Sequence, residues 1–301
     1  MAPADLHYQV DIAHWGWSIA WFLWFIGIAG MGSVAYFFVR RAALAYVIFG
    51  SLVVGLLFVV SHLGRWWNLP RTLWTMAING IFNWNSWMLV GICMLSVHLI
   101  LSAIIVAGHI PFLQRYGWLR WTKTLGSASA YLAAYALLGF GATVYSGFLI
   151  TQAAGIPLWN TSLIPVLWVV SGSIAAIAVL ELLYVFGLVD ASVSSLAVRL
   201  GIGLDAIKLL AVLGFLHVAL SFGSAGARIG ATAMASGEFA LMTWGGVIGI
   251  GILIPLAIGT YTVLVKKSKA LLLVSSVAAL AGVFFLRAVV LLAGVWEPLV
   301  L

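Results

Sequence analysis

Residues capable of proton and anion chemistry gather where one long apolar segment ends and the next begins. This boundary holds His62, Arg65, Arg71 and the run Asn85-Ser86-Trp87-Met88. A histidine exchanges protons near neutral pH, and an arginine stabilises an anion. Only 7% of the residues are charged and 64% are hydrophobic, so each ionisable group among the apolar segments requires an explanation. In membranes, such groups tend to face cavities, ion paths or cofactor sites.

The composition is that of an integral membrane protein. The mean hydropathy is +1.19, and apolar runs with short loops occupy nearly all of the 301 residues. The net charge of +7 lies mostly in those loops, so we attribute it to membrane topology and predict no nucleic-acid partner. The single cysteine, Cys93, is expected to pack as a small residue. No Lys or Arg precedes the first apolar run, so we expect that run to be retained as a span.

Eight apolar runs are long enough to cross a bilayer, which requires about 20 residues per helix. The sixth run is the least regular, because Asp205 and Lys208 fall within it. We predict an all-α integral membrane protein with one polytopic domain over 1–301, and with spans near 14–39, 42–64, 85–108, 125–151, 162–188, 202–223, 240–265 and 270–294.

The basic residues predict how these spans are oriented. With eight spans, both termini lie on one side, where the loops carry Arg65, Arg71 and Arg228. The opposite side carries nine Lys and Arg residues, including the turn Lys266-Lys267-Ser268-Lys269. Because basic loops stay in the cytoplasm, we place both termini outside and the protein in the cytoplasmic membrane. Many tryptophans then gather at the outer side, where they indicate an aromatic belt or a docking surface: Trp15, Trp17, Trp21, Trp66, Trp67, Trp74, Trp84, Trp87 and Trp159.

Polar residues from several spans fall at a similar depth near that outer side, as a pocket between helices requires. A quinone head group needs hydrogen-bond donors for its two carbonyl oxygens and a group that passes protons. Tyr145 could donate its phenol hydrogen, and Arg65 could stabilise a quinol anion. Hydration, snorkelling and an interfacial position are the alternative explanations for these residues. The predicted quinone ligands are His14, His62, Arg65, Asn85, Ser86, Tyr145 and Gln152.

A second, smaller polar group lies in the inner half of the protein. Glu181 is late in the fifth span, and Asp205 and Lys208 are early in the sixth. Antiparallel packing of these spans predicts an ion pair between Glu181 and Lys208. The group is interpreted either as a structural salt bridge or, together with His98 in the third span, as a proton path from the cytoplasm.

Four segments of the chain form a recognisable pattern. The first is the glycine-bearing first span, from Trp21 to Tyr36. The second is His62-Leu63-Gly64-Arg65 with Arg71 and Asn85-Ser86-Trp87-Met88. The third is Tyr145-Ser146-Gly147-Phe148-Leu149 with Pro157-Leu158-Trp159, Pro165 and Ser171-Gly172, and the fourth is Phe285-Leu286-Arg287. Together these segments resemble the NrfD/PsrC family, the membrane subunits of polysulfide-reductase-type molybdenum and iron–sulfur oxidoreductases. Two positions depart from the family pattern. His62 stands where the family usually has aspartate, and Trp66 stands where it usually has proline.

The resemblance implies a fold of two four-helix bundles and a quinone-reactive subunit without haem or iron–sulfur cluster of its own. It implies menaquinone or ubiquinone bound near the outer face. It also implies a ferredoxin-like iron–sulfur subunit docked on that face, which in turn serves a molybdopterin catalytic subunit. On this interpretation the chain is not a complete catalyst alone but takes part in respiratory electron transfer, with or without proton translocation.

Two other functions remain open from the residues. A b-type cytochrome needs paired histidines on facing helices, whereas only His98 lies deep within a span. A transporter or ion channel often contains internal repeats and broken helices, and Pro255 is the one proline in the middle of a span.

Overall fold

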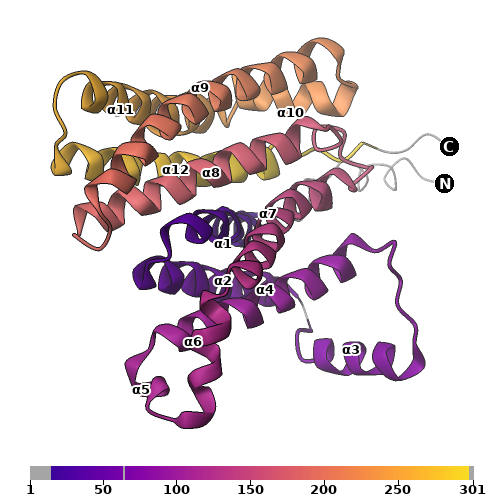
Figure 1. Cartoon of the computed structure of the whole chain (residues 1–301). Coiled ribbons are helices and arrows are strands. Elements are labelled where there is room, and N and C mark those ends of the chain that lie inside the picture. Colours follow the sequence, from indigo (N-terminus) through magenta and orange to yellow (C-terminus); the bar gives the residue numbers. More distant parts are fainter. Residues whose placement is uncertain (1–14, 64, 298–301) are drawn as a thin grey trace.

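The computed structural model describes residues 15–63 and 65–297, which form helices joined by short connections (Figure 1). Eight helical segments are long and apolar enough to cross a membrane, which confirms the predicted number. The protein is therefore an all-helical, multi-pass membrane protein. The spans are α1 (Trp17–Val39), α2 (Ala42–His62), α4 (Trp87–His109), α7 (Ser129–Thr151), α8 (Leu163–Val185), α9 (Ala191–Phe222), the seventh span Leu241–Leu264 (η3 and α11) and α12 (Lys269–Leu292).

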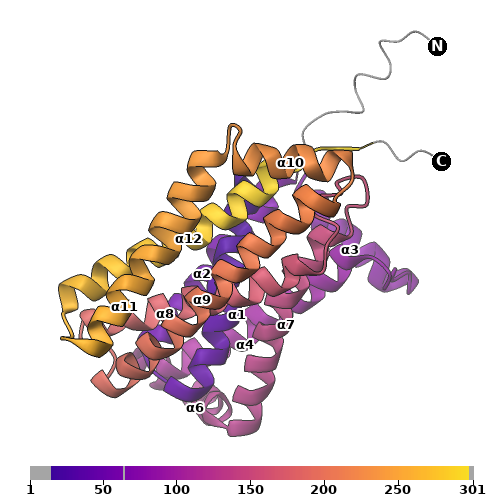
Figure 2. The ribbon, with the colours of Figure 1, turned by 90° about the horizontal axis from the view of Figure 1, so that it is seen from above.

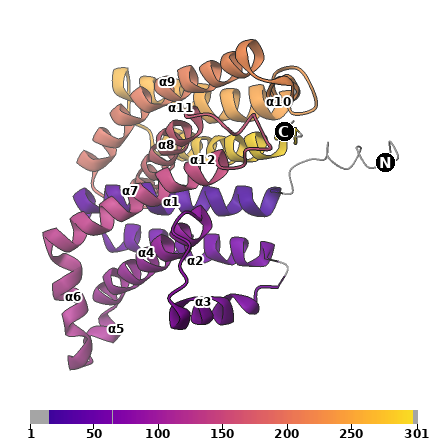
Figure 3. The same ribbon diagram turned by 90° about the vertical axis from the view of Figure 1, so that its right-hand side faces the viewer.

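The spans pack as two sets of four. α1, α2, α4 and α7 form the N-terminal set, and α8, α9, the seventh span and α12 form the C-terminal set (Figures 1 and 3). α8 lies between the sets, because it contacts α1 and α7 on one side and α9 and α12 on the other. This arrangement agrees with the two bundles implied by the family resemblance.

The spans end at two opposite faces. We call the face that holds Trp15 and Glu297, the first and last described residues, the terminal face. There the rings of Trp15 and Trp159 lie 5.8 Å apart, and the Glu297 N–H donates to the Gly155 carbonyl oxygen at 2.8 Å. The opposite face carries the connections that follow α1, α4, α8 and α11. At that face, an ion pair between Arg41 and Asp190 joins the N-terminal set to the start of α9.

The sixth span differs from the prediction, because α9 begins at Ala191 rather than near 202 and contains 32 residues. At 1.5 Å per residue it is about 48 Å long, which exceeds the roughly 30 Å of a bilayer core. Its first turns, Ala191–Arg199, are rich in serine and lack a continuous apolar run. Hydropathy alone therefore missed them, although a helix satisfies its backbone groups in water as well as in lipid.

The seventh span is not a uniform α-helix. Its first part, η3 (Leu241–Leu253), is a π-helix, and α11 (Ile254–Leu264) continues it as an α-helix. Pro255 stands at the junction, where its missing N–H interrupts the helical bonding pattern. π-Helical turns are rare and are often found at functional sites.

Shorter helices cover the two faces. α3 (Asn68–Asn79) and α10 (Ala225–Ala235) lie at the terminal face, and Figure 1 shows α3 standing away from the spans. No residue of α3 is buried. At the opposite face, α5 (Pro111–Gln114), η2 (Gly117–Leu119) and α6 (Arg120–Ser127) connect α4 to α7, with α6 visible below the spans in Figure 2. Hydropathy alone predicts loops where the structure has these short helices.

Candidate functional site

The terminal end of the N-terminal set holds a buried tyrosine in an aromatic setting. Tyr145, on α7, is 5% exposed, and its ring stacks on that of Trp87 with centroids 6.2 Å apart. Trp87 also stacks on Phe148, one turn further along α7. Gly91 makes the approach possible, because a Cβ atom there would collide with the Tyr145 ring and hydroxyl. The position of Tyr145 thus depends on a glycine of α4.

His62 lies at the end of α2 and is tied to the start of α1. Its Nδ1 atom lies 3.0 Å from the Ser18 hydroxyl oxygen. Both groups are at the terminal face, and the His62 side chain is exposed. The contact therefore joins two spans of the set that also carries Tyr145.

The other predicted quinone ligands differ in their surroundings. The Ser86 hydroxyl caps the N-terminus of α4 by accepting a hydrogen bond from the Leu89 N–H at 3.4 Å. Arg65, Asn85 and Gln152 are exposed at the terminal face. His14 lies outside the described residues. The structure thus brings Tyr145 and Trp87 together, while the exposed residues lie at the same face.

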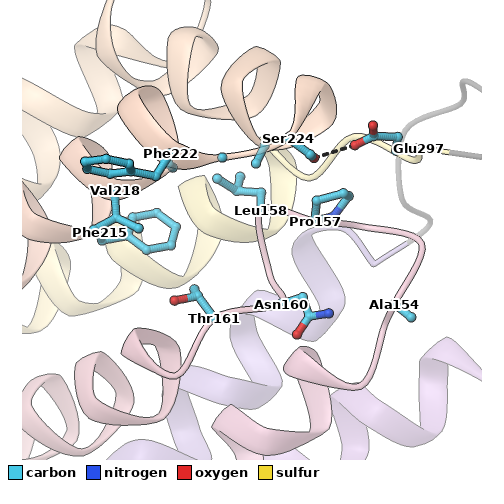
Figure 4. Close-up of a pocket in the computed structure, with 13 residues that line it drawn as sticks. Ala154, Pro157, Leu158, Asn160, Thr161, Phe215, Val218, Phe222, Ser224 and Glu297 are labelled. Atoms are coloured by element: carbon cyan, nitrogen blue, oxygen red, sulfur yellow. Dashed lines mark hydrogen bonds between the residues drawn. The ribbon is translucent and has the colours of Figure 1, made fainter. Parts of the chain in front are cut away.

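A cavity of about 570 Å³ opens at the terminal face of the C-terminal set (Figure 4). Apolar side chains of α9 form one wall, including Phe215, Val218 and Phe222. Asn160 and Glu297 also line the cavity, and the Glu297 carboxylate accepts hydrogen bonds from the Ser224 hydroxyl and from the Gly226 N–H at 3.0 Å. None of the predicted quinone ligands that the structure describes is among its lining residues. The cavity is therefore separate from the Tyr145 group.

Arg287 is a fully buried cation. It lies in one of the segments that resemble the family, but it is not among the predicted ligands. From α12, its Nε donates to the Leu23 carbonyl oxygen of α1, and one terminal nitrogen donates to the Ser171 hydroxyl of α8, each at 3.0 Å. The other terminal nitrogen, Nη2, has no hydrogen-bond partner among the described residues. It lies over Gly27, where any Cβ atom would strike it. The sequence signal was a lone arginine within a continuous apolar run.

The inner polar group does not form the predicted ion pair. Glu181 accepts a hydrogen bond from the Ser276 hydroxyl at 3.0 Å, and Lys208 donates to the Gly251 carbonyl oxygen at 3.2 Å. Within the described residues, the one ion pair is that of Arg41 with Asp190. The prediction of a Glu181–Lys208 pair was wrong, because the two side chains project toward α12 and the seventh span instead of toward each other.

Glu181 and Asp205 nevertheless line one small cavity of about 20 Å³, close to the volume that one water molecule requires. At the nearby opposite face, Lys267 donates to the Ala191 carbonyl oxygen at 3.2 Å. Partial burial lowers the pKa of Lys267, and the Glu181 carboxylate opposes that shift. The buried carboxylate therefore interacts electrostatically with a lysine at the opposite face.

His98 belongs to the other set of helices. It is fully buried on α4, and its Nε2 lies 2.8 Å from the Ser33 hydroxyl oxygen of α1. No described hydrogen bond connects His98 with Glu181, Asp205 or Lys208. The four residues predicted as one path therefore divide between the two sets.

The described residues contain no group of three or more His, Cys, Asp and Glu side chains arranged to hold a metal ion. The polar groups at both faces are instead hydrogen-bonding residues, aromatic rings and isolated charges. Such an arrangement can bind an organic ligand and move protons.

The sequence comparisons identify the family of this chain. The family model described as "Polysulphide reductase, NrfD" matches residues 7–297. The chain belongs to the NrfD family. Among its relatives, protein NrfD homolog of Haemophilus influenzae is 26% identical, with 93% of this chain and 94% of the relative aligned. The polysulfide reductase C-chain of Wolinella succinogenes is 25% identical, with 95% and 96% aligned. Protein NrfD of Escherichia coli is 26% identical, with 93% and 94% aligned.

Proposed function

We propose that this NrfD-family protein is a quinone-reactive electron-transfer subunit of a respiratory complex in the cytoplasmic membrane. It exchanges electrons between menaquinone or ubiquinone and a ferredoxin-like iron–sulfur subunit that serves a molybdopterin catalytic subunit. The name of the W. succinogenes relative, one of the chains of a polysulfide reductase, supports membership of such an assembly over nearly the full length. The terminal face is then the outer face, as the distribution of basic loops predicts.

The observation that carries this proposal is the Tyr145–Trp87 pair. The described hydrogen bonds leave the Tyr145 hydroxyl available as a donor, although the side chain is almost buried. A phenol donor beside a flat aromatic ring fits a quinone head group, which stacks on rings and accepts hydrogen bonds at its carbonyl oxygens. His62, Arg65, Asn85, Ser86 and Gln152 at the same face would complete the polar surroundings, and His14 is proposed as a further ligand. The bound quinone would supply the two-electron chemistry, while Tyr145 would orient one carbonyl and His62 would exchange a proton.

The terminal face also suits a partner subunit. Between α2 and α4, four tryptophans are exposed beside Arg65 and Arg71: Trp66, Trp67, Trp74 and Trp84. Aromatic residues and arginines are enriched in protein interfaces. We assign this surface to the iron–sulfur subunit, whose cluster must come close to the quinone for electron transfer.

The C-terminal polar group of Glu181, Asp205 and Lys208 is proposed to carry protons from the cytoplasm. Two buried carboxylates around a water-sized cavity support this role. His98 is part of the proposed proton chemistry but lies in the other set.

The test is quinone turnover by the complex purified with its partner subunits. Tyr145→Phe removes one oxygen atom and should lower turnover about 100-fold, the order of losing a donor to developing charge. Tyr261→Phe, an exposed tyrosine of α11, is the matched control and should keep wild-type turnover. Equal turnover in both variants would refute the site, and purification without any iron–sulfur partner would refute the proposed assembly.

A further inference from the structure

A cavity of about 170 Å³, partly lined by charged side chains, enters the N-terminal set from the opposite face. It lies among α1, α4 and α6, and Arg40 and Lys123 are among its lining residues. Two other lining residues are in contact with each other, since the Tyr36 hydroxyl lies 2.6 Å from Nε2 of His109. Tyr36 is buried, so this contact forms the inner end of the cavity. Water-exposed charges therefore lie beside a contact between a buried tyrosine and a half-buried histidine.

Further polar side chains continue inward from this pair. The ring of Tyr135 packs against that of Tyr36, with centroids 6.3 Å apart, and its hydroxyl donates to the Ser102 hydroxyl at 3.1 Å. The His98 ring lies 5.1 Å from the Tyr135 ring on the other side. His98 then contacts Ser33. We call these six residues the inner column: His109, Tyr36, Tyr135, Ser102, Ser33 and His98.

The hydrogen bonds of Ser33 indicate which nitrogen of His98 carries the proton. The Ser33 hydroxyl lies 2.8 Å from the Ala29 carbonyl oxygen, to which it donates its single proton. We therefore assign the 2.8 Å contact between Ser33 and His98 Nε2 to donation by the imidazole N–H. In the neutral ring, Nδ1 is then the bare acceptor, and it has no partner within the described residues although His98 is fully buried. An unpartnered buried acceptor costs about 1–3 kcal/mol, so it needs a physical reason.

We propose that the inner column is a proton-transfer path that enters at the Arg40–Lys123 cavity and ends at Nδ1 of His98. A proton taken up by His109 passes through the Tyr36 and Tyr135 hydroxyls, each of which receives one proton and releases another, with water molecules bridging the gaps. Nδ1 of His98 receives the last proton, and the ring returns to neutrality when it releases a proton toward the quinone side. No electron moves along the column. The inference rests on the proposed function, because quinone reduction at the terminal face is the reaction that consumes the protons.

The alternative is a purely structural role for the inner column. The contact between α7 and α4 contains an example of such a role. Tyr131, one turn before Tyr135 on α7, donates its hydroxyl proton to the Leu101 carbonyl oxygen at 2.7 Å. That bond fastens α7 to α4 and leads to no further polar side chain. Tyr135 instead bonds to a hydroxyl and packs between Tyr36 and His98. Tyr131→Phe is therefore a matched control for Tyr135→Phe.

The experiment uses the complete complex with its redox partners, reconstituted in liposomes that contain a pH-sensitive dye. A redox substrate that does not cross the membrane restricts turnover to copies whose terminal face points outward. The lumen then adjoins the opposite face, and the dye measures protons exchanged through that face per quinone turned over. Tyr135→Phe and His98→Gln should lower both lumenal proton exchange and quinone turnover about 100-fold, the lower end of the range typical of proton-transfer groups. Tyr131→Phe should retain both.

Two further measurements separate proton transfer from packing. The affinity for a quinone analogue should be unchanged in Tyr135→Phe, and a small weak acid that carries protons should restore its turnover. Failure of the weak acid to restore turnover, or wild-type proton exchange in both variants, would overturn the path. If the wild-type complex turns over quinone without lumenal proton exchange, the path fails while the proposed function stands. If the wild-type complex does not react with quinone, both fail.

Discussion

Lys208 donates a hydrogen bond from its ammonium group to the carbonyl oxygen of Gly251, and Gly251 lies four residues before Pro255. Gly251 lies in the π-helix η3, and Pro255 follows at the start of α11, where it has no N–H to donate back to that helix. The fully buried lysine therefore places its ammonium group where the bonding pattern of the seventh span changes. This relationship explains a buried lysine in the sixth span without an ion pair to Glu181.

The Lys208–Gly251 bond predicts a loss of stability when the ammonium group is removed. Lys208→Met should lower the free energy of unfolding by about 1–3 kcal/mol, because it removes a buried hydrogen bond from a charged donor to a backbone carbonyl. Thermal unfolding of the variant and the wild type in detergent measures the loss. Equal stability of the two proteins would contradict this role for Lys208.

Gly91→Ala should disturb the quinone site although Gly91 is not itself a proposed quinone ligand. The added methyl group must displace the Tyr145 ring, because the two cannot occupy the same space. Quinone turnover should fall at least tenfold, equivalent to about 1.4 kcal/mol of lost transition-state stabilisation. Gly203→Ala is the control, since a Cβ atom at that position meets no neighbouring atom within 4 Å. Turnover at the wild-type level in Gly91→Ala would show that the position of Tyr145 is unimportant.

Arg287→Lys should destabilise the contact between the two sets of helices. Lysine keeps the charge but lacks the planar group that reaches Leu23 and Ser171 simultaneously. We expect a loss of about 3 kcal/mol, near the range for breaking a buried charged contact. Ser171→Ala should lose only about 1 kcal/mol, since a single hydrogen bond to Arg287 is removed. Thermal unfolding in detergent checks this order, and a larger loss in Ser171→Ala than in Arg287→Lys would reverse the interpretation.

Glu297→Ala should loosen the cavity shown in Figure 4. The carboxylate accepts hydrogen bonds from Ser224 and Gly226 at the start of α10, so its loss removes a helix-capping interaction of about 1 kcal/mol. Hydrogen exchange of the Gly226 amide should become faster by about fivefold, which corresponds to that free energy. Glu238→Ala changes an exposed carboxylate beyond the end of α10 and should leave the exchange unchanged. Unchanged exchange in Glu297→Ala would show that α10 does not depend on this contact.

The number of spans and their membrane character follow from the sequence, because lipid requires long apolar helices whose backbone bonds are internal. The polar residues near the terminal face, including Tyr145 and His62, could also be recognised in the sequence. Their depth depends only on their position along a span. The start of α9 and the π-helix of the seventh span could not be found in this way, because hydropathy does not report backbone geometry.

The tertiary structure determines which buried polar groups contact one another. The sequence places Glu181 and Lys208 at a similar depth, but Glu181 turns to Ser276 and Lys208 to Gly251. His98 joins Ser33 and the N-terminal set rather than the carboxylates. Depth follows from counting residues along one helix, whereas the partner depends on the rotation of that helix and on its neighbours. In lipid, those choices are governed by close packing and hydrogen bonds between distant segments, which a single span does not encode.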